Sequence, residues 1–132
     1  MKRFMHRTAS TALVLMTTVR CTNHRSEAVQ YVTSHGRDIV TSTRPLWIKY
    51  KAHAIEIPPS EYPPHVRALK PVQVFVNEKG VTMYIYSVYW NVTGIYIRYD
   101  PAFDPPSTLP PDSVETRYER LAPDLYWFSR PR

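Results

Sequence analysis

The middle of the chain constrains the fold most strongly, because three β-type runs follow one another there with only short polar turns between them. Valines alternate with other residues over 72–77, and β-branched and aromatic residues fill 81–90 and 95–99. This pattern predicts an antiparallel three-stranded meander. The first turn ends in Gly80, and we expect this glycine to take a left-handed backbone conformation there. A second turn is expected over 91–94.

Two other segments have the character of strands. Apolar residues alternate with polar and charged ones from Leu46 onward, and the alternation changes face near Ile55, which predicts a bent strand over 46–57. The aromatic run at 125–128 predicts a short C-terminal strand. With the meander, these segments indicate a mainly β protein with a small antiparallel sheet, arranged as a sandwich or a partly open barrel. At most one or two short helices are expected, one of them over 113–122.

Proline interrupts the chain often: there are 13 prolines and only 3 glycines. Proline has no amide hydrogen and fixes its own φ angle, so paired prolines break helices and favour extended backbone. Proline-rich loops are therefore expected over 58–71 and 101–112. The segment 27–45 is expected to be a linker or a short helix. Residues 46–132 are expected to form a single small β-rich domain, since a chain of this length can bury one core.

The first 26 residues differ from the rest of the chain in charge. They contain five basic residues and no acidic one, whereas the whole chain has 17 Lys and Arg against 11 Asp and Glu. The remaining residues, 27–132, are therefore nearly neutral. A basic start followed by the apolar stretch 8–19 is typical of a secretory signal peptide. That stretch is shorter than the roughly 20 residues of a transmembrane helix, so we expect an exported protein in the periplasm or cell envelope.

The sequence leaves alternatives open for this N-terminal segment. Cys21, the only cysteine, follows the apolar stretch and resembles the lipid-modified cysteine of bacterial lipoproteins, although Arg20 stands where those proteins have a small residue. Lipidation would attach the protein to a membrane through this leader. Ordinary cleavage, for example after Ala28, is a second interpretation. An arginine-rich, acid-free N-terminus also fits a mitochondrial presequence, and an N-terminal extension without a targeting role is the remaining one.

One group of residues in the meander suggests a binding surface. Tyr84, Tyr86 and Trp90 alternate along the second run, and Tyr96 and Arg98 follow on the third. Tyrosine combines a flat apolar ring with a polar tip and is frequent at interfaces. These five residues therefore form a candidate recognition face for a protein, a peptide or a glycan. The alternative is that the aromatic side chains form the core of a thin sheet.

The sequence offers little sign of catalysis. It shows no metal-ligand spacing, no nucleophile motif and no glycine-rich phosphate loop, so we assign no catalytic residue, metal or cofactor. No basic cluster in the body of the chain indicates a nucleic-acid partner. We therefore expect a non-enzymatic binding or structural module of the cell envelope. The alternative is a hydrolase-like or enzyme-inhibitor domain whose site includes His53 or His65. The sequence does not indicate an oligomeric state.

The charge asymmetry generates the first testable prediction. In the native host, we expect the leader to be removed within about the first 21–28 residues, or Cys21 to be acylated. The intact mass of the purified protein measures this directly. Acylation adds mass and moves the protein to the membrane fraction, whereas simple cleavage only removes mass. Recovery of the full-length mass from the cytosol would contradict the prediction.

Overall fold

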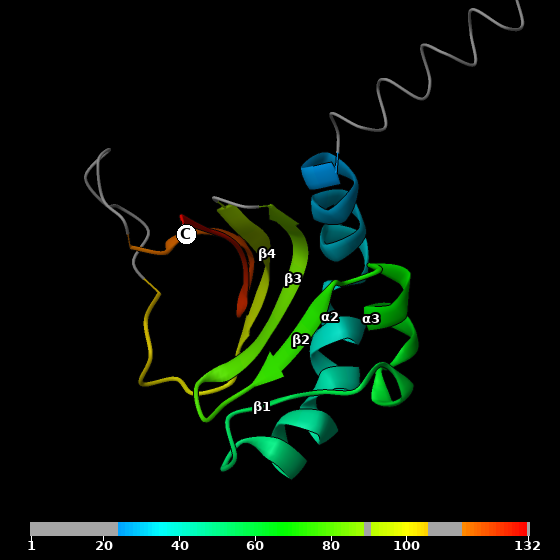
Figure 1. Ribbon diagram of the computed structural model, residues 1–132, viewed down its shortest axis with the longest axis vertical. Coiled ribbons are helices and arrows are strands. Elements are labelled where there is room, and N and C mark those ends of the chain that lie inside the picture. Colours follow the sequence, from blue (N-terminus) through cyan, green and yellow to red (C-terminus); the bar gives the residue numbers. More distant parts are fainter. Residues whose placement is uncertain (1–23, 89–90, 106–114, 132) are drawn as a thin grey trace, which may run out of the picture.

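The computed structural model describes residues 24–88, 91–105 and 115–131. Within these ranges the chain forms a six-stranded antiparallel sheet with one long helix and two short helical segments (Figure 1). The expected mainly β class is confirmed. The strands lie in the order β1-β2-β3-β4-β6-β5 and form one open, curved sheet rather than the two layers of a sandwich. The elements are α2 (His24–Tyr50), β1 (Ile55–Glu56), η1 (Pro59–Glu61), α3 (Pro64–Ala68), β2 (Gln73–Val76), β3 (Gly80–Val88), β4 (Asn91–Arg98), β5 (Arg117–Ala122) and β6 (Leu125–Pro131).

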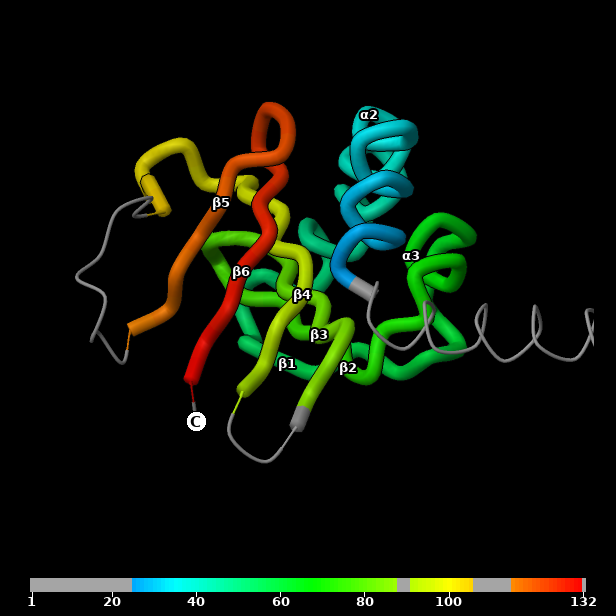
Figure 2. Tube along the Cα trace, turned by 90° about the horizontal axis from the view of Figure 1, so that it is seen from above, coloured from blue at the N-terminus to red at the C-terminus, as the bar shows by residue number. Residues whose placement is uncertain are grey.

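Both α-helices lie on the same side of the sheet (Figure 1, Figure 2). The main core lies between them and the sheet: Val32 and Ile39 of α2 are fully buried there, together with Val81, Met83 and Ile97 of the central strands. The strand residues are alternate ones, so the sheet presents one apolar face to the helices. Burial of each such side chain contributes about 1.5–3 kcal/mol. The contact between α2 and the sheet therefore organises the fold.

The expected strand over 46–57 is wrong for most of its length. α2 extends to Tyr50, and only Ile55–Glu56 belongs to a strand. The helix has 27 residues, whereas the sequence indicated only short helices, and it includes all of 27–45. The long element of this region is thus helical, and the strand that follows it is a short edge strand.

A helical pattern overlaps the alternating one, and packing against the sheet selects the helical pattern. Ile39, Thr43 and Leu46 recur at helical spacing, and all three are buried. A strand would bury Ile48 on the same face as Leu46, but Ile48 is 59% exposed. The alternation of apolar and polar residues from Leu46 onward therefore does not predict which side chains are buried.

The meander is confirmed in strand order and direction, since β2, β3 and β4 are antiparallel neighbours. The expected turn over 91–94 is wrong, because these residues already belong to β4. Gly94 lies opposite an irregularity in β3, where the register shifts between Tyr84 and Tyr86. A Cβ atom at Gly94 would lie 1.8 Å from the backbone oxygen of Met83. This glycine therefore allows two backbones to approach closely at a bulge.

Gly80 stands at the expected turn for a reason other than the expected one. None of the three glycines has a positive φ angle. The side-chain oxygen of Asn77 makes the turn by accepting hydrogen bonds from the backbone amides of Lys79 (2.9 Å) and Gly80 (3.1 Å). A Cβ atom at Gly80 would lie 2.0 Å from the backbone oxygen of Ile97 on β4. The position therefore requires glycine for space, and the left-handed conformation is not used.

The C-terminal part of the chain forms a hairpin at one edge of the sheet. The expected short strand over 125–128 is confirmed as part of β6, and its four aromatic and aliphatic side chains are buried. The expected helical turns over 113–122 are wrong for Arg117–Ala122, which form β5 and pair with β6, while 113–114 lie outside the described residues. The register of this pair shifts between Arg120 and Ala122. No helix in the described part of the chain has the length and apolar character needed to cross a membrane.

The close approach at Gly80 leads to a stability prediction. Gly80→Ala should lower the free energy of unfolding by more than about 1 kcal/mol, because even a methyl group overlaps the β4 backbone. Urea denaturation measures the change. Glu78→Ala, at an exposed position of the same turn, is the control and should change stability by less than about 0.5 kcal/mol. Equal stabilities of the two variants would show that the strands do not approach as described.

Candidate functional site: an aromatic cleft

The face of the sheet turned away from the helices carries a second apolar cluster. Its buried members are one valine and three aromatic residues, and further aromatic side chains pack against them from β3, from the segment after β4 and from β5. The cluster contains Val92, Tyr96, Tyr126 and Phe128, with Tyr84, Phe103 and Tyr118 packed against it. This face thus carries a smaller apolar cluster than the helix-covered one, built largely from rings, several of which have polar tips.

The strand register leaves a hollow in the middle of this face. Two rows of neighbouring residues cross the central strands, and in each row a small residue stands between two large rings. The rows are Phe75–Thr82–Tyr96 and Tyr84–Gly94–Phe128. Thr82 and Gly94 fill little space, so the rings of Tyr84 and Phe128 approach to 5.9 Å between centroids across the glycine. The surrounding rings therefore form walls around a depression.

The depression is a cleft of about 270 Å³, which we call the aromatic cleft. Its volume is close to the lower end of the range for small-molecule sites, about 300 to 1,000 Å³. Its walls come from five strands, β2 to β6, and from two connecting segments. The lining residues are Phe75, Asn77, Lys79, Thr82, Tyr84, Tyr96, Phe103, Thr116, Tyr118, Phe128 and Arg130.

Two cations line the cleft. The ammonium group of Lys79 lies 4.8 Å from the ring centroid of Phe103. The guanidinium group of Arg130 lies 5.5 Å from the ring centroid of Tyr84 and donates a 2.6 Å hydrogen bond to its hydroxyl. Such contacts with rings hold a cation in place without neutralising it. None of the described lining residues is a carboxylate, so the part of the cleft that the structure describes is positively charged.

Tyr96 is the unusual member of the lining. It is only 4% exposed, and its hydroxyl is buried without a hydrogen-bond partner in the described part of the chain. Burial is the main cause that raises the pKa of Tyr96, and the neighbouring Tyr118 raises it further. The hydroxyl therefore stays protonated at neutral pH, and its donor hydrogen has no acceptor among the described residues. Buried polar groups nearly always have a partner, so this one calls for an explanation.

The structure separates the five residues of the expected recognition face. Tyr84 and Tyr96 line the aromatic cleft. Tyr86 pairs with Thr93, which alternates with the cleft-side residues of β4, so the bulge in β3 turns Tyr86 to the opposite face from Tyr84. Tyr86 is 46% exposed there. Trp90 lies outside the described residues, as does Cys21.

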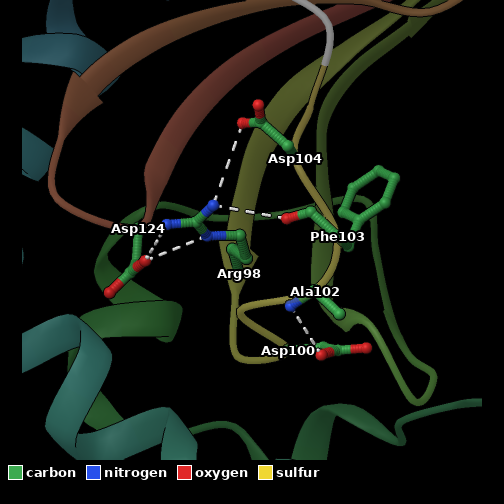
Figure 3. Close-up of polar contacts among 6 residues, drawn as sticks. All are labelled: Arg98, Asp100, Ala102, Phe103, Asp104 and Asp124. Carbon is green, nitrogen blue, oxygen red and sulfur yellow. Dashed lines mark hydrogen bonds and ion pairs between the residues drawn. The ribbon is translucent and has the colours of Figure 1, made fainter.

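Arg98, the fifth residue, has a structural setting. It donates hydrogen bonds to the carboxylate of Asp124 at 3.1 and 2.9 Å and to the backbone oxygen of Phe103 at 3.3 Å (Figure 3). The carboxylate of Asp104 lies 3.9 Å from the same guanidinium. Arg98 therefore connects the segment after β4 to the turn between β5 and β6. It positions Phe103, which does line the cleft.

The two histidines of the alternative interpretation lie apart from each other and from the aromatic cleft. His53 lies exposed in the turn after α2. His65 on α3 joins a cluster with α2: its Nδ1 atom lies 2.9 Å from the hydroxyl of Tyr31, and its Nε2 atom lies 4.0 Å from the carboxylate of Asp38. The ring of His35 lies 5.2 Å from that of His65. This cluster joins the two helices. No group of three or more metal-ligating side chains that could hold an ion occurs among the described residues.

Sequence reasoning missed most of the cleft. The sequence pattern predicts only a C-terminal strand for Phe128 and helical turns for Tyr118, and it indicates no role for Lys79 and Arg130. The lining residues are far apart in the sequence, and they meet only because β6 lies beside β4 in the sheet. The available signal was the alternation in 125–130, which places two aromatic residues and Arg130 on one face of a strand.

The unpartnered hydroxyl leads to a prediction for the free protein. Tyr96→Phe should leave the free energy of unfolding unchanged or raise it by up to about 1 kcal/mol, because the hydroxyl is desolvated without gaining a hydrogen bond. Thermal and urea unfolding measure this. Tyr99→Phe is the matched control and should be destabilising, because the hydroxyl of Tyr99 donates a 2.6 Å hydrogen bond to the backbone oxygen of Val40. A Tyr96→Phe variant as destabilised as the control would show that Tyr96 has a partner.

Comparison with known proteins found no matching family model, no matching curated protein and no matching solved structure. The function is therefore inferred from the chain's own residues.

Proposed function

We propose that this protein is a non-enzymatic binding module that holds a small ring-bearing ligand in the aromatic cleft. The observation that carries the proposal is the buried hydroxyl of Tyr96, which lacks a partner beside a cleft walled by aromatic rings. A ligand that enters this cleft can stack on the rings, and it can supply the missing acceptor once a neighbouring side chain moves aside, because the hydroxyl itself has almost no exposed surface. Sites of this kind are mostly apolar with a few convergent polar groups.

The chemistry of the lining supports binding rather than catalysis. The side chains that line the cleft are rings, hydroxyls, one amide and two cations. None of these described lining residues is a carboxylate, an imidazole or a thiol, the groups that most often accept a proton or act as a nucleophile near neutral pH. The arrangement favours retention of a ligand without chemical change.

We also propose that the module works after export, in the periplasm or cell envelope. The support is the acid-free leader with its apolar stretch. Helix α2 adds a condition on the processing site. Arg25 in its first turn pairs with Glu119 and lies 5.8 Å from the ring centroid of Trp127, and Ala28 is buried in the core. Cleavage after Ala28 would remove these contacts, so a processing site at or before Asn23 keeps the fold intact.

The binding proposal is tested with a neutral ring compound, 2-naphthylacetamide. Titration followed by two-dimensional NMR should shift the amide signals of Thr82, Gly94 and Tyr96, which surround the cleft, and leave those of α2 unchanged. Thr82→Phe should abolish these shifts, because it fills the floor of the cleft. Ser34→Phe adds the same ring at an exposed position of α2 and should bind normally.

Shifts that spread over the helix, or that persist in Thr82→Phe, would mean that the compound binds elsewhere. The absence of any shift up to the solubility limit of the compound would contradict the proposed function. A native-like spectrum of Thr82→Phe shows that the variant has folded and makes the comparison valid.

A further inference from the structure

We infer that the natural ligand of the aromatic cleft is a planar apolar ring that carries a carboxylate, and that the carboxylate binds at the end of the cleft formed by the β2–β3 turn. This inference rests on the proposed function and names its ligand class. It also assigns a binding role to Asn77, Lys79 and Tyr96, which lie together at that end.

The charge of the cleft favours an anion over a neutral or cationic ligand. Lys79 and Arg130 both line it, and no carboxylate of the lining residues opposes them. A cleft with walls of low polarity and charges of one sign concentrates the field of those charges. An anionic ligand is therefore attracted into the cleft, and a cationic one is repelled.

The donors converge at one end of the cleft. A Cβ atom built on Gly80 would lie 3.0 Å from the hydroxyl of Tyr96, so this hydroxyl lies beside the β2–β3 turn. Lys79 belongs to the same turn. The Oδ1 atom of Asn77 is occupied by two backbone amides, so its remaining polar group, the Nδ2 amine, is a donor. The residues that carry an ammonium, a hydroxyl and an amide group thus lie at the same end of the cleft, and a carboxylate is an acceptor that suits all three groups.

The turn that carries these donors is held from both sides. The indole nitrogen of Trp47 on α2 donates a 3.0 Å hydrogen bond to the backbone oxygen of Asn77. The backbone oxygen of Lys79 accepts hydrogen bonds from the amides of Tyr99 and Asp100, both at 3.0 Å. The backbone that carries Asn77 and Lys79 is therefore fixed before a ligand arrives. This limits the entropy that binding would otherwise cost.

The opposite end of the cleft is less suited to the carboxylate. Arg130 pairs with Val92 near the start of β4, whereas Gly80 pairs with Arg98 at its end, so Arg130 and the turn lie at opposite ends of the strand. The guanidinium of Arg130 already donates to the hydroxyl of Tyr84. The buried donor without a partner, Tyr96, lies at the Lys79 end. Arg130 adds to the positive field, and Lys79 makes the contact.

The inference is tested with three probes that share one ring: 2-naphthylacetate, 2-naphthylacetamide and 2-(2-naphthyl)ethylammonium. The anion should bind about tenfold more tightly than the amide, as expected for hydrogen bonds to a charged group, and the cation most weakly. Lys79→Gln should remove about tenfold of the affinity for the anion and change that for the amide little. Arg37→Gln removes one charge from an exposed position of α2 and is the control, with unchanged affinities.

A second variant tests the buried donor. Tyr96→Phe should weaken binding of the anion about fivefold, the size of a single hydrogen bond, without loss of folding. If the amide binds in the cleft and the anion binds no better, the inference fails while the proposed function stands. If the preference for the anion is lost in Arg130→Gln and kept in Lys79→Gln, the assigned position of the carboxylate is wrong. If no probe binds, both proposals fail.

Discussion

The packing of α2 against one face of the sheet is the constraint on which the rest of the structure depends. A sheet has two faces, and a chain of this size can bury only a limited amount of apolar surface. Here the aliphatic residues of alternate strand positions meet the helix, and Val32 and Ile39 lie at the centre of that contact. The second face is then left to aromatic residues, whose rings pack together around the buried hydroxyl of Tyr96. Because α2 covers the aliphatic face of the sheet, the opposite face remains uncovered by helices and can form the cleft.

The sequence contained enough local information for the meander and for the C-terminal strand, because the side chains there alternate as the sheet buries them. It was misleading at 46–57, where a helical and a strand pattern overlap and only contact with the sheet distinguishes them. The sequence also showed no sign of the bulge between Tyr84 and Tyr86, because aromatic residues alternate there as they would in a regular strand. The position of Gly80 at the turn was predicted correctly. The reason for a glycine there is the close backbone of β4, and the sequence of the turn itself does not reveal that neighbour.

The candidate site was predictable only in part, for a physical reason. Tyr84 and Tyr96 belong to neighbouring strands of one meander, so their proximity follows from the local pattern. Phe128 and Arg130 reach the same face because β6 pairs with β4, a long-range choice that local propensity does not specify. Arg98 belongs to the predicted recognition face by its place on the strand after Tyr96, but Asp124 holds its guanidinium group. Sequence reasoning finds aromatic residues in a site of this kind, and the fold decides which of them meet.

The two edges of the sheet restrict how any partner can bind. β1 has two residues, and β5, at the other edge, carries Arg117, Glu119 and Arg120 and has an irregular register near its end. Short, charged and irregular edge strands are poor templates for another chain, because they offer few aligned backbone groups in succession. Extension of the sheet by a foreign strand is thus disfavoured at both borders. If the proposed function holds, recognition uses the side chains of the sheet face, and shape and charge rather than backbone pairing would set the selectivity.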